Sequence, residues 1–303
     1  MISGCILSTV NDTFAHISFK KDITRMKFIK ILSFLFLLTA ISPVFAQYSI
    51  RGKVLNINSK KPVSNVSVGL SHSNNGALSD AAGNFRMYID DIRNTDTLTI
   101  SSIGFVTLKI PVQQAIKQSQ FLLTEDSKSM DNIELNSYTS EASQGTISET
   151  TGYFFSWHTQ QTGGELGRIM YVNSNDYKLE RVRVKINNQC DTCLIRLHIR
   201  ELDNGLPGDD LLKDSITVTT NRLSFDDKFV EFDLRNNDVI IKKNKYVFVG
   251  FETLNCNSTI ASSGCSLAYI GTEDGNFLYR NKGYHDWEES TMHSLYIRLF
   301  YKY

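Results

Sequence analysis

Apolar side chains recur at every second position along most of this 303-residue chain. A period of two is typical of half-buried β-strands, because successive side chains of a strand point to opposite faces of its sheet. Residues 49–54 and 63–70 show the pattern, and turn-forming residues follow each of them. The one helix candidate is the short segment 112–119, which follows Pro111. We therefore predict an all-β fold, with strands at the spacing expected of β-sandwiches.

Residues 26–46 have the features of a secretory signal peptide. Lys27 and Lys30 place positive charge around the start of an apolar run over residues 31–41. The following Val44-Phe45-Ala46 presents small or apolar residues at the positions that a signal peptidase inspects. We predict cleavage at the end of this segment and export to the periplasm, the outer membrane or the extracellular space.

A retained membrane anchor is the alternative interpretation of the same stretch. A lysine, two serines and a proline interrupt its apolar residues, whereas a spanning helix needs about 20 predominantly apolar ones. The favoured prediction is that the protein is not an integral membrane protein. Residues 1–25 are polar and unlike a targeting segment, which makes them a candidate upstream mis-start and Met26 the candidate true start.

The charge of the region after Ala46 bears on its partners. This region has 27 Lys or Arg residues and 30 Asp or Glu residues, so its net charge is −3. A nucleic-acid-binding surface is typically a basic stripe with interleaved aromatic residues, and the sequence shows none. We therefore expect no nucleic-acid partner.

Four cysteines follow the leader, namely Cys190, Cys193, Cys256 and Cys265. An even number of cysteines in an exported chain predicts disulfides. Of the three possible pairings, the local one (Cys190 with Cys193, Cys256 with Cys265) is favoured, because each bond would close a polar loop between two strands. A structural zinc site is an alternative, although the second pair is wider than the usual spacing. A redox-active C-x-x-C is another, although no helix N-terminus is expected there to lower a thiol pKa.

An ordered series of short segments lies between residues 47 and 135. They are Ile-Arg-Gly-Lys-Val at 50–54, Lys-Pro-Val at 61–63 before Val-Ser-Val at 66–68, Leu-Ser-Asp-Ala-Ala-Gly-Asn-Phe at 78–85, and Leu-Thr-Ile-Ser-Ser-Ile-Gly-Phe at 98–105. In this order they resemble the carboxypeptidase-regulatory-like, peptidase-associated domain, a transthyretin-like β-sandwich of exported proteins of the Bacteroidetes type. Residues 130–135 resemble the short strand that often follows such domains. The resemblance implies a non-catalytic module that accompanies other domains.

The same residues have physical roles that do not depend on the resemblance. Pro62 can begin a strand without its missing N–H, and Asp80 and Gly83 suit the two ends of a tight turn. Phe85 is expected to enter the core. Gly104 is expected to permit a bulge or a close backbone approach at a strand end.

The remaining chain divides by composition. We predict a first sandwich over 47–125, a linker over 126–152 that is rich in Ser, Thr, Asn, Glu and Gly, and a second sandwich over 153–303. The last region has about ten strand-like runs, which favours a jelly-roll-like sandwich. No family is assigned to it.

Two metal sites can be considered from the sequence. His198 and Glu201 have the H-x-x-E spacing of zinc carboxypeptidases, with His285 or His293 as a third ligand. However, an odd separation places the pair on opposite faces of a strand, so we assign no catalytic or metal residue and no cofactor. A structural calcium ion is the second case, with the oxygen ligands Asp203, Asn204, Asp209 and Asp210 in one loop, although a plain turn is favoured.

Aromatic residues in or beside polar loops are the best binding candidates, because flat rings can stack on a sugar or anchor a protein partner. These are Trp157, Tyr284, His285 and Trp287. The leading hypothesis is a non-enzymatic exported protein of the cell envelope that binds a glycan or an envelope protein through its second sandwich. The alternative is a hydrolase that acts on envelope polysaccharide or peptide.

Overall fold

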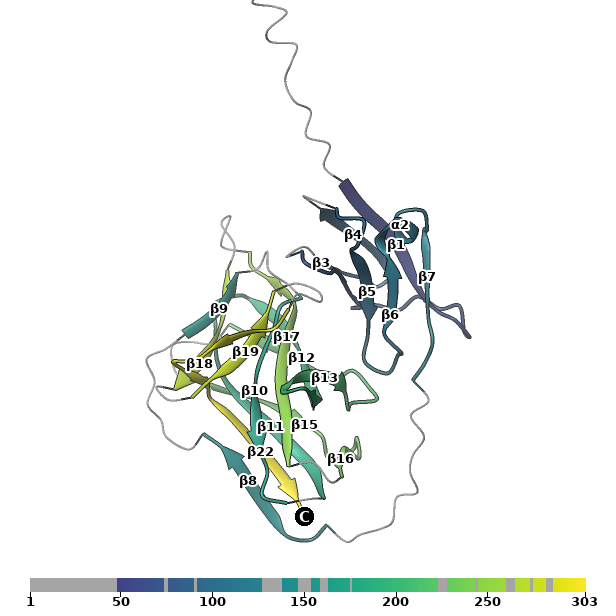
Figure 1. Cartoon of the computed structure of the whole chain (residues 1–303). Helices are drawn as coiled ribbons and strands as arrows, with labels where there is room; N and C mark the ends of the chain where they lie inside the picture. The colour runs from purple at the N-terminus through teal and green to yellow at the C-terminus, as the bar shows by residue number, and fades with distance from the viewer. Residues whose placement is uncertain are drawn as a thin grey trace, which may run out of the picture. The chain divides into compact units, whose positions relative to one another are not determined.

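The computed structural model describes residues 48–303 except 74–75, 90–91, 127–137, 147–153, 159–162, 175, 223–227, 243–244, 260–264, 273–274 and 282–285. Residues Gln47–Tyr303 form one compact unit. The predicted mis-start, the predicted signal peptide and the predicted strand near residue 133 lie outside the described residues. The described part is almost entirely β-structure, which confirms the predicted all-β class (Figure 1).

The first sandwich consists of two sheets. One has the order β4 (Asn84–Ile89), β1 (Tyr48–Asn56) and β7 (Gln120–Leu123), and the other has β3 (Gly76–Leu78), β2 (Ser67–Leu70), β5 (Thr97–Ser101) and β6 (Leu108–Pro111). Strand β4 alternates exposed and buried residues, as the sequence pattern predicts. Phe85 and Phe121 meet in the core with ring centroids 5.4 Å apart. The helix is shorter than predicted, since α2 comprises only Val112–Ala115.

The predicted turn before β4 is confirmed. Asp80 Oδ1 accepts hydrogen bonds from the backbone N–H groups of Ala82 and Asn84, and Gly83 has a φ of 77°. A side chain at Gly83 would also collide with the carbonyl oxygen of Val54, because an added Cβ would lie 2.5 Å from it. The glycine is therefore required both by the turn and by the packing of β1.

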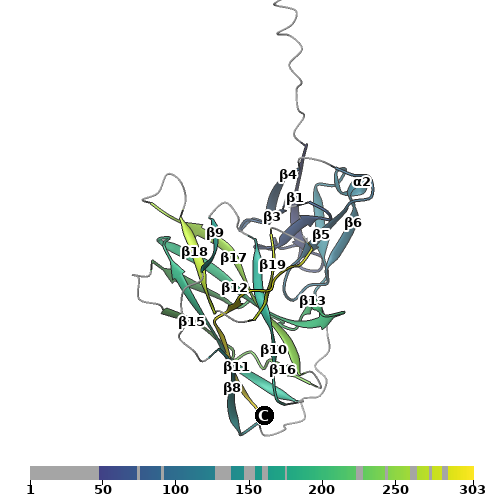
Figure 2. The same ribbon diagram turned by 60° about the vertical axis from the view of Figure 1, so that its left-hand side comes forward.

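The second sandwich also has two sheets, and Figure 2 shows its strands from another side. The seven-stranded sheet runs β13 (Leu206–Asp210), β12 (Thr192–Asp203), β17 (Tyr246–Asn257), β10 (Glu165–Tyr171), β19 (Phe277–Arg280) and β20 (Glu288–Ser290), with β14 (Thr217–Asn221) paired to β12. The eight-stranded sheet runs β21 (Ser294–Leu295), β18 (Ser266–Thr272), β11 (Tyr177–Asn188), β22 (Ile297–Lys302) and β8 (Glu141–Gly145). To it are added β15 (Lys228–Asp233) and β16 (Ile240–Ile241) on β11, and β9 (Phe154–His158) on β18. A continuous apolar core lies between the two sheets.

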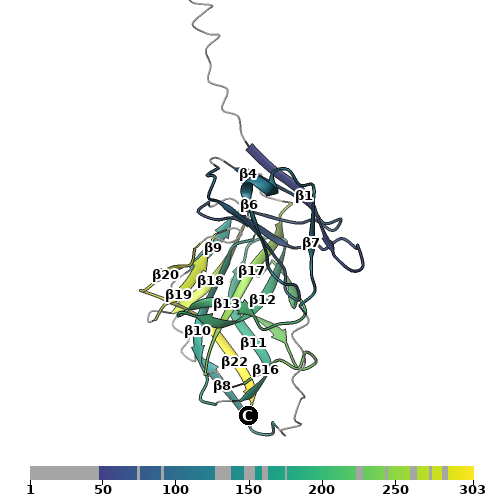
Figure 3. The ribbon, with the colours of Figure 1, turned by 45° about the vertical axis from the view of Figure 1, so that its right-hand side comes forward.

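Strand β8 falls within the segment predicted as a linker. It pairs antiparallel with β22, from Glu141 opposite Lys302 to Gly145 opposite Arg298, and Figure 3 shows the two side by side. Its sequence, Glu-Ala-Ser-Gln-Gly, lacks apolar alternation because the strand lies at the sheet edge with most of its side chains exposed. Backbone hydrogen bonds therefore recruit a segment that side-chain pattern alone would leave as a loop.

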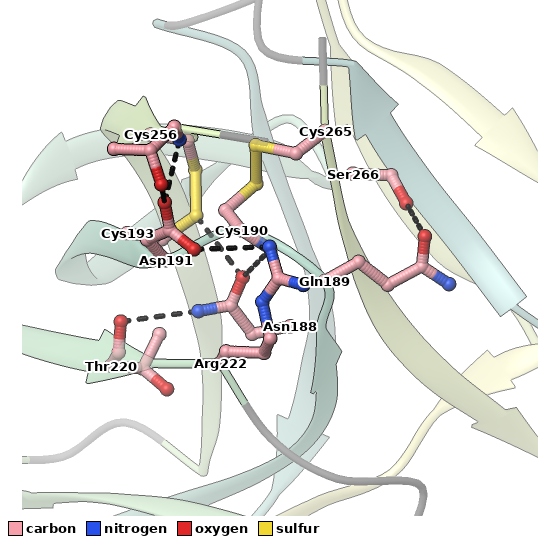
Figure 4. The surroundings of a disulfide bond; sticks show 11 residues. Asn188, Gln189, Cys190, Asp191, Cys193, Thr220, Arg222, Cys256, Cys265 and Ser266 are labelled. Carbon is pink, nitrogen blue, oxygen red and sulfur yellow. Dashed lines mark hydrogen bonds and ion pairs between the residues drawn. A yellow bond between two sulfur atoms is a disulfide. The ribbon is translucent and has the colours of Figure 1, made fainter. Parts of the chain in front are cut away.

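The two disulfides differ from the favoured pairing. Cys190 is bonded to Cys265 and Cys193 to Cys256, so the local pairing was wrong (Figure 4). Cys193 on β12 lies directly opposite Cys256 on β17, with their Cα atoms 4.1 Å apart. The register of two long strands decides the pairing, and distance along the sequence does not.

Each disulfide should contribute substantially to stability, because it closes a long loop. The sequence separations are 63 and 75 residues, for which loop-closure entropy gives about 4 kcal/mol per bond. We expect Cys193→Ser/Cys256→Ser to lower the free energy of unfolding by about that amount in urea denaturation under non-reducing conditions. Cys190→Ser/Cys265→Ser should give a similar loss. A loss below about 1 kcal/mol in both would contradict the observed pairing.

Candidate functional site

A row of buried charges crosses four neighbouring strands of the seven-stranded sheet. Arg196 on β12 lies opposite Glu252 on β17, which lies opposite Glu165 on β10, which in turn lies opposite Arg280 on β19. With three adjacent residues they form what we call the ionic cluster: Glu165, Arg196, His198, Arg200, Asp210, Glu252 and Arg280. Six of its seven members are at most 8% exposed. Burial of this many charged groups is unusual unless they are paired.

Strand β12 positions the cationic side of the cluster. Its residues Ile195, Leu197 and Ile199 face the sandwich core, so the residue that follows each of them faces the other way. Those residues are Arg196, His198 and Arg200. The same two-residue period that builds the core thus places three nitrogen-bearing side chains in line on the outer face.

Glu165 is the centre of one half of the cluster. Its two carboxylate oxygens accept hydrogen bonds from Arg200 Nε and Nη2 at 2.9 and 3.1 Å, and Arg280 Nε donates a third at 3.1 Å. Burial alone would raise the pKa of this carboxyl, but the attraction of Arg200, His198 and Arg280 lowers it far below its usual value. These contacts therefore favour the ionised form of Glu165.

In the other half of the cluster, His198 connects Glu252 with Asp210. Its Nε2 lies 2.9 Å from Glu252 Oε2 and its Nδ1 lies 2.5 Å from Asp210 Oδ2. Burial and Arg200 lower the pKa of His198, whereas Glu165 and Asp210 raise it, and the net shift is upward. The carboxylates on both sides of the ring thus favour its protonated form, in which each nitrogen can donate a hydrogen bond.

Glu252 is fixed by three partners. Arg196 donates from Nε and Nη2 at 3.0 and 2.6 Å, and Ser67 Oγ of the first sandwich donates to the other oxygen at 2.8 Å. Burial raises the pKa of this carboxyl, but Arg196 and His198 lower it to about 2. Arg196 Nη1 also donates to the carbonyl oxygen of Asn65 at 2.8 Å. The first sandwich therefore supplies hydrogen-bond partners for Arg196 and Glu252, which would otherwise bond to water.

Two glycines make room for these side chains. Gly250 lies opposite His198, and an added Cβ there would come within 2.4 Å of the Phe248 ring and 3.0 Å of Glu165 Oε1. An added Cβ at Gly167 would lie 2.6 Å from the same ring. The Phe248 ring therefore occupies the space beside both glycines. It also contacts Trp287, with ring centroids 5.0 Å apart.

A cavity of about 800 Å³ opens against the ionic cluster. Its wall includes Arg196, His198, Arg200, Glu252 and Arg280 of the cluster, the loop at 101–107 and Lys109 of the first sandwich, and the hairpin at 206–210. Ile103 in that loop belongs to the core of the second sandwich. Next to it, Gly104 has a φ of 81°, and an added Cβ would lie 2.4 Å from the carbonyl oxygen of Lys213. This confirms the close backbone approach predicted at Gly104.

The aromatic candidates from the sequence have different outcomes. Trp287 lies half-buried in the cavity wall, with the Arg280 guanidinium 4.5 Å from its ring centroid. Trp157 belongs to β9, paired with Leu267, and its side chain is not described. Tyr284 and His285 lie outside the described residues. The structure therefore brings only Trp287 to the cavity among the residues that can be placed.

Among the described residues, neither of the two metal sites considered from the sequence is assembled. Strand β12 continues to Asp203, so the buried His198 and the exposed Glu201 face opposite sides, as the spacing predicts. In the calcium candidate, Asn204 and Gly205 form a tight turn with φ values of 52° and 83°, while the Asp210 carboxylate is bonded to His198. In the described part of the chain, the one group of three suitable side chains close enough to share a metal ion consists of cysteines.

The ionic cluster itself was not predicted. Its signal on β12 was the alternation of Arg196, His198 and Arg200, which the sequence shows directly. Of its acidic partners, Asp210 is 12 residues from His198, whereas Glu165 and Glu252 lie on strands 35 to 56 residues away from their arginine partners on β12. That pairing is a property of strand order and register, which a single sequence does not reveal.

Comparison with known proteins identifies the first sandwich. Residues 50–135 match the family model of the CarboxypepD_reg-like domain, which confirms the resemblance predicted above and defines a non-catalytic β domain. The match covers less than a third of the chain and does not reach the second sandwich. A search of curated protein sequences found no match.

Solved structures give only distant similarities. The structure of infectious bursal disease virus Gt strain has 8% identity and a TM-score of 0.30, with 86% of this chain and 67% of that chain covered. The VP2 subviral particle of the same virus has 10% identity and a TM-score of 0.26, with 85% and 65% covered. Similarities this weak support no inference about this chain.

Among the described residues, no helix has the length and apolar character needed to cross a bilayer.

Glu165 provides a direct test of the cluster. Glu165→Gln would remove the buried carboxylate that both Arg200 and Arg280 contact, so we expect the free energy of unfolding to fall by about 3 kcal/mol or more. Glu201→Gln is the matched control, because Glu201 is exposed on the same strand β12, and it should change stability by less than about 0.5 kcal/mol. Equal effects of the two variants would contradict the assignment.

The cluster also predicts how stability depends on pH. The pKa of His198 is raised in the folded state, so its contribution is complete below the unfolded value of 6.5 and is lost as pH rises through the folded value. The contribution of Glu252 is instead lost as pH falls from 4.5 towards 2. The free energy of unfolding, measured by urea denaturation across this pH range, should therefore fall at high pH (the alkaline limb) and at low pH (the acid limb). His198→Gln should abolish the alkaline limb, and His72→Gln, at an exposed position, should retain it.

Proposed function

We propose that this chain is a non-enzymatic, exported adaptor protein of the cell envelope that binds a glycan in the cavity beside the ionic cluster. The observation that carries the proposal is the composition of the cavity wall. It combines hydroxyl groups, carboxylates and guanidinium groups with one indole ring. A sugar hydroxyl both donates and accepts hydrogen bonds, so a wall that presents both kinds of group suits a polyhydroxylated ligand.

The ionic cluster would make this wall rigid. Glu252 is held by Arg196, His198 and Ser67, so its position does not depend on a ligand. Preorganised polar groups increase affinity because less conformational freedom is lost on binding. The wall therefore resembles a binding surface that is formed in advance.

Trp287 would supply the apolar contact. Arg280 and Phe248 fix the orientation of its ring, and the ring contributes to the cavity surface. Aromatic rings bury a large area while losing little side-chain freedom, and this is useful against the flat face of a sugar.

The charges argue for binding rather than hydrolysis. A glycosidase needs one carboxyl group with a raised pKa as its general acid. In this cavity the pKa of Glu252 is instead lowered to about 2 by Arg196 and His198. Asp210, which reaches the cavity, is already bonded to His198. The non-catalytic character of the first domain and the two disulfides also agree with an exported accessory protein.

Binding can be tested by a glycan array followed by isothermal titration calorimetry with the best glycan. We expect Trp287→Ala to weaken binding by about 10-fold or more, which is the value of a well-packed aromatic contact. Tyr171→Ala is the matched control, because Tyr171 is an exposed aromatic residue of β10 that does not line the cavity. Absence of glycan binding, or equal affinities of the two variants, would contradict the proposal. Capture of an envelope protein by the same surface would indicate the other partner class.

A further inference from the structure

The four cysteines of the two disulfides form one cluster at the end of the second sandwich. Cys190 follows β11, Cys193 is the second residue of β12, Cys256 lies near the end of β17, and Cys265 precedes β18. The sulfur atoms of Cys190, Cys193 and Cys256 all lie within 4.8 Å of one another, and that of Cys265 is bonded to Cys190 (Figure 4). Four sulfur atoms from four strand ends thus converge on one point.

We propose that this cluster, when reduced by a dithiol, binds one Zn²⁺ ion through its four thiolates. Each disulfide takes two electrons and two protons from the dithiol, which becomes a cyclic disulfide, and releases two cysteine thiols. The four thiols then lose four protons as they bind the ion. The proposal is independent of glycan binding, since it concerns residues outside the cavity.

The geometry suits a tetrahedral site. Zinc–sulfur bonds of about 2.3 Å place the ligand sulfurs about 3.8 Å apart, so the three sulfurs that already lie within 4.8 Å of one another need only small movements, and the fourth, of Cys265, is bonded to one of them. Cys190 and Cys193 supply the C-x-x-C spacing of many structural zinc sites. The wide spacing of Cys256 and Cys265 is no obstacle, because pairing of β17 with β12 and of β18 with β11 brings both to the same place.

The surroundings are compatible with a thiolate site. Cys190 and Cys193 are fully buried, whereas Cys256 is only half-buried and offers access to a reductant and to the metal. The neighbouring carboxylate of Asp191 accepts hydrogen bonds from Arg222 at 3.0 Å and from Thr259, so its negative charge is offset. Asn188 lies beneath the cluster, where its Oδ1 accepts from the N–H of Cys190.

The disulfide-bonded state and the zinc-bound state would connect the strands of the second sandwich differently. In the oxidised state, each disulfide joins strands of one sheet, since Cys190 and Cys265 adjoin the eight-stranded sheet and Cys193 and Cys256 the seven-stranded sheet. A single zinc ion would join all four strand ends. The zinc-bound chain would therefore gain a link between the two sheets that neither disulfide provides.

The test uses the full chain carrying Cys5→Ser, which removes the one cysteine outside the cluster. After reduction by a dithiol and its removal under anaerobic conditions, we expect one Zn²⁺ per chain by elemental analysis. Cobalt in place of zinc should give the intense visible bands of a tetrahedral thiolate complex. Affinity for Zn²⁺ should be at least about 100-fold weaker in Cys190→Ser/Cys265→Ser and in Cys193→Ser/Cys256→Ser, since each retains only two ligands.

A parallel measurement separates a folded site from adventitious binding to free thiols. Far-ultraviolet circular dichroism should show retained β-structure in the zinc-bound reduced chain, and thermal unfolding should occur at a higher temperature with zinc than without it. The proposal is overturned if zinc fails to bind stoichiometrically or binds the double variants equally well. It is also overturned if the affinity is unchanged in denaturant, or if the reduced chain unfolds and zinc does not restore its structure.

Discussion

The bidentate contact between Glu165 and Arg200, extended by Arg280, determines much of what surrounds it. Buried charges lose their hydration, and only close, complete pairing offsets that cost. The cluster achieves this through strand register, with Arg196, Glu252, Glu165 and Arg280 in one row. Two side chains of the row have further partners in the first sandwich: Arg196 donates to the carbonyl oxygen of Asn65, and Glu252 accepts from Ser67. Contact between the two sandwiches is therefore tied to the pairing within one sheet.

Much of the fold could be predicted from the sequence, because its strands are amphipathic. Alternation over residues 49–54 and 63–70 located β1 and β2, and the turn chemistry of Asp80 and Gly83 was correct in detail. Strand β8 was missed because an exposed edge strand needs no apolar face. The disulfide pairing was wrong because Cys193 and Cys256 meet through register, and local spacing carries no information about register.

The candidate site was harder to predict for a related physical reason. Trp287 was named from its polar sequence context, and it does line the cavity. His198 was examined for the wrong partner, Glu201, whereas its real partners Asp210 and Glu252 lie on neighbouring strands. Cysteine and histidine chemistry in β-sandwiches depends on residues that are distant in sequence. A short spacing motif within a single strand is consequently weak evidence for either a metal site or an active site.

The two disulfides are nested, since the Cys190–Cys265 bond encloses the Cys193–Cys256 bond along the chain. A protease that cuts once anywhere between residues 194 and 255 would produce two pieces that both bonds still hold together. The hairpin of β12 and β13 and the following β14 and β15 lie inside this double ring. A nicked molecule would thus keep its cavity wall in place, which would give the protein tolerance to a single proteolytic cut.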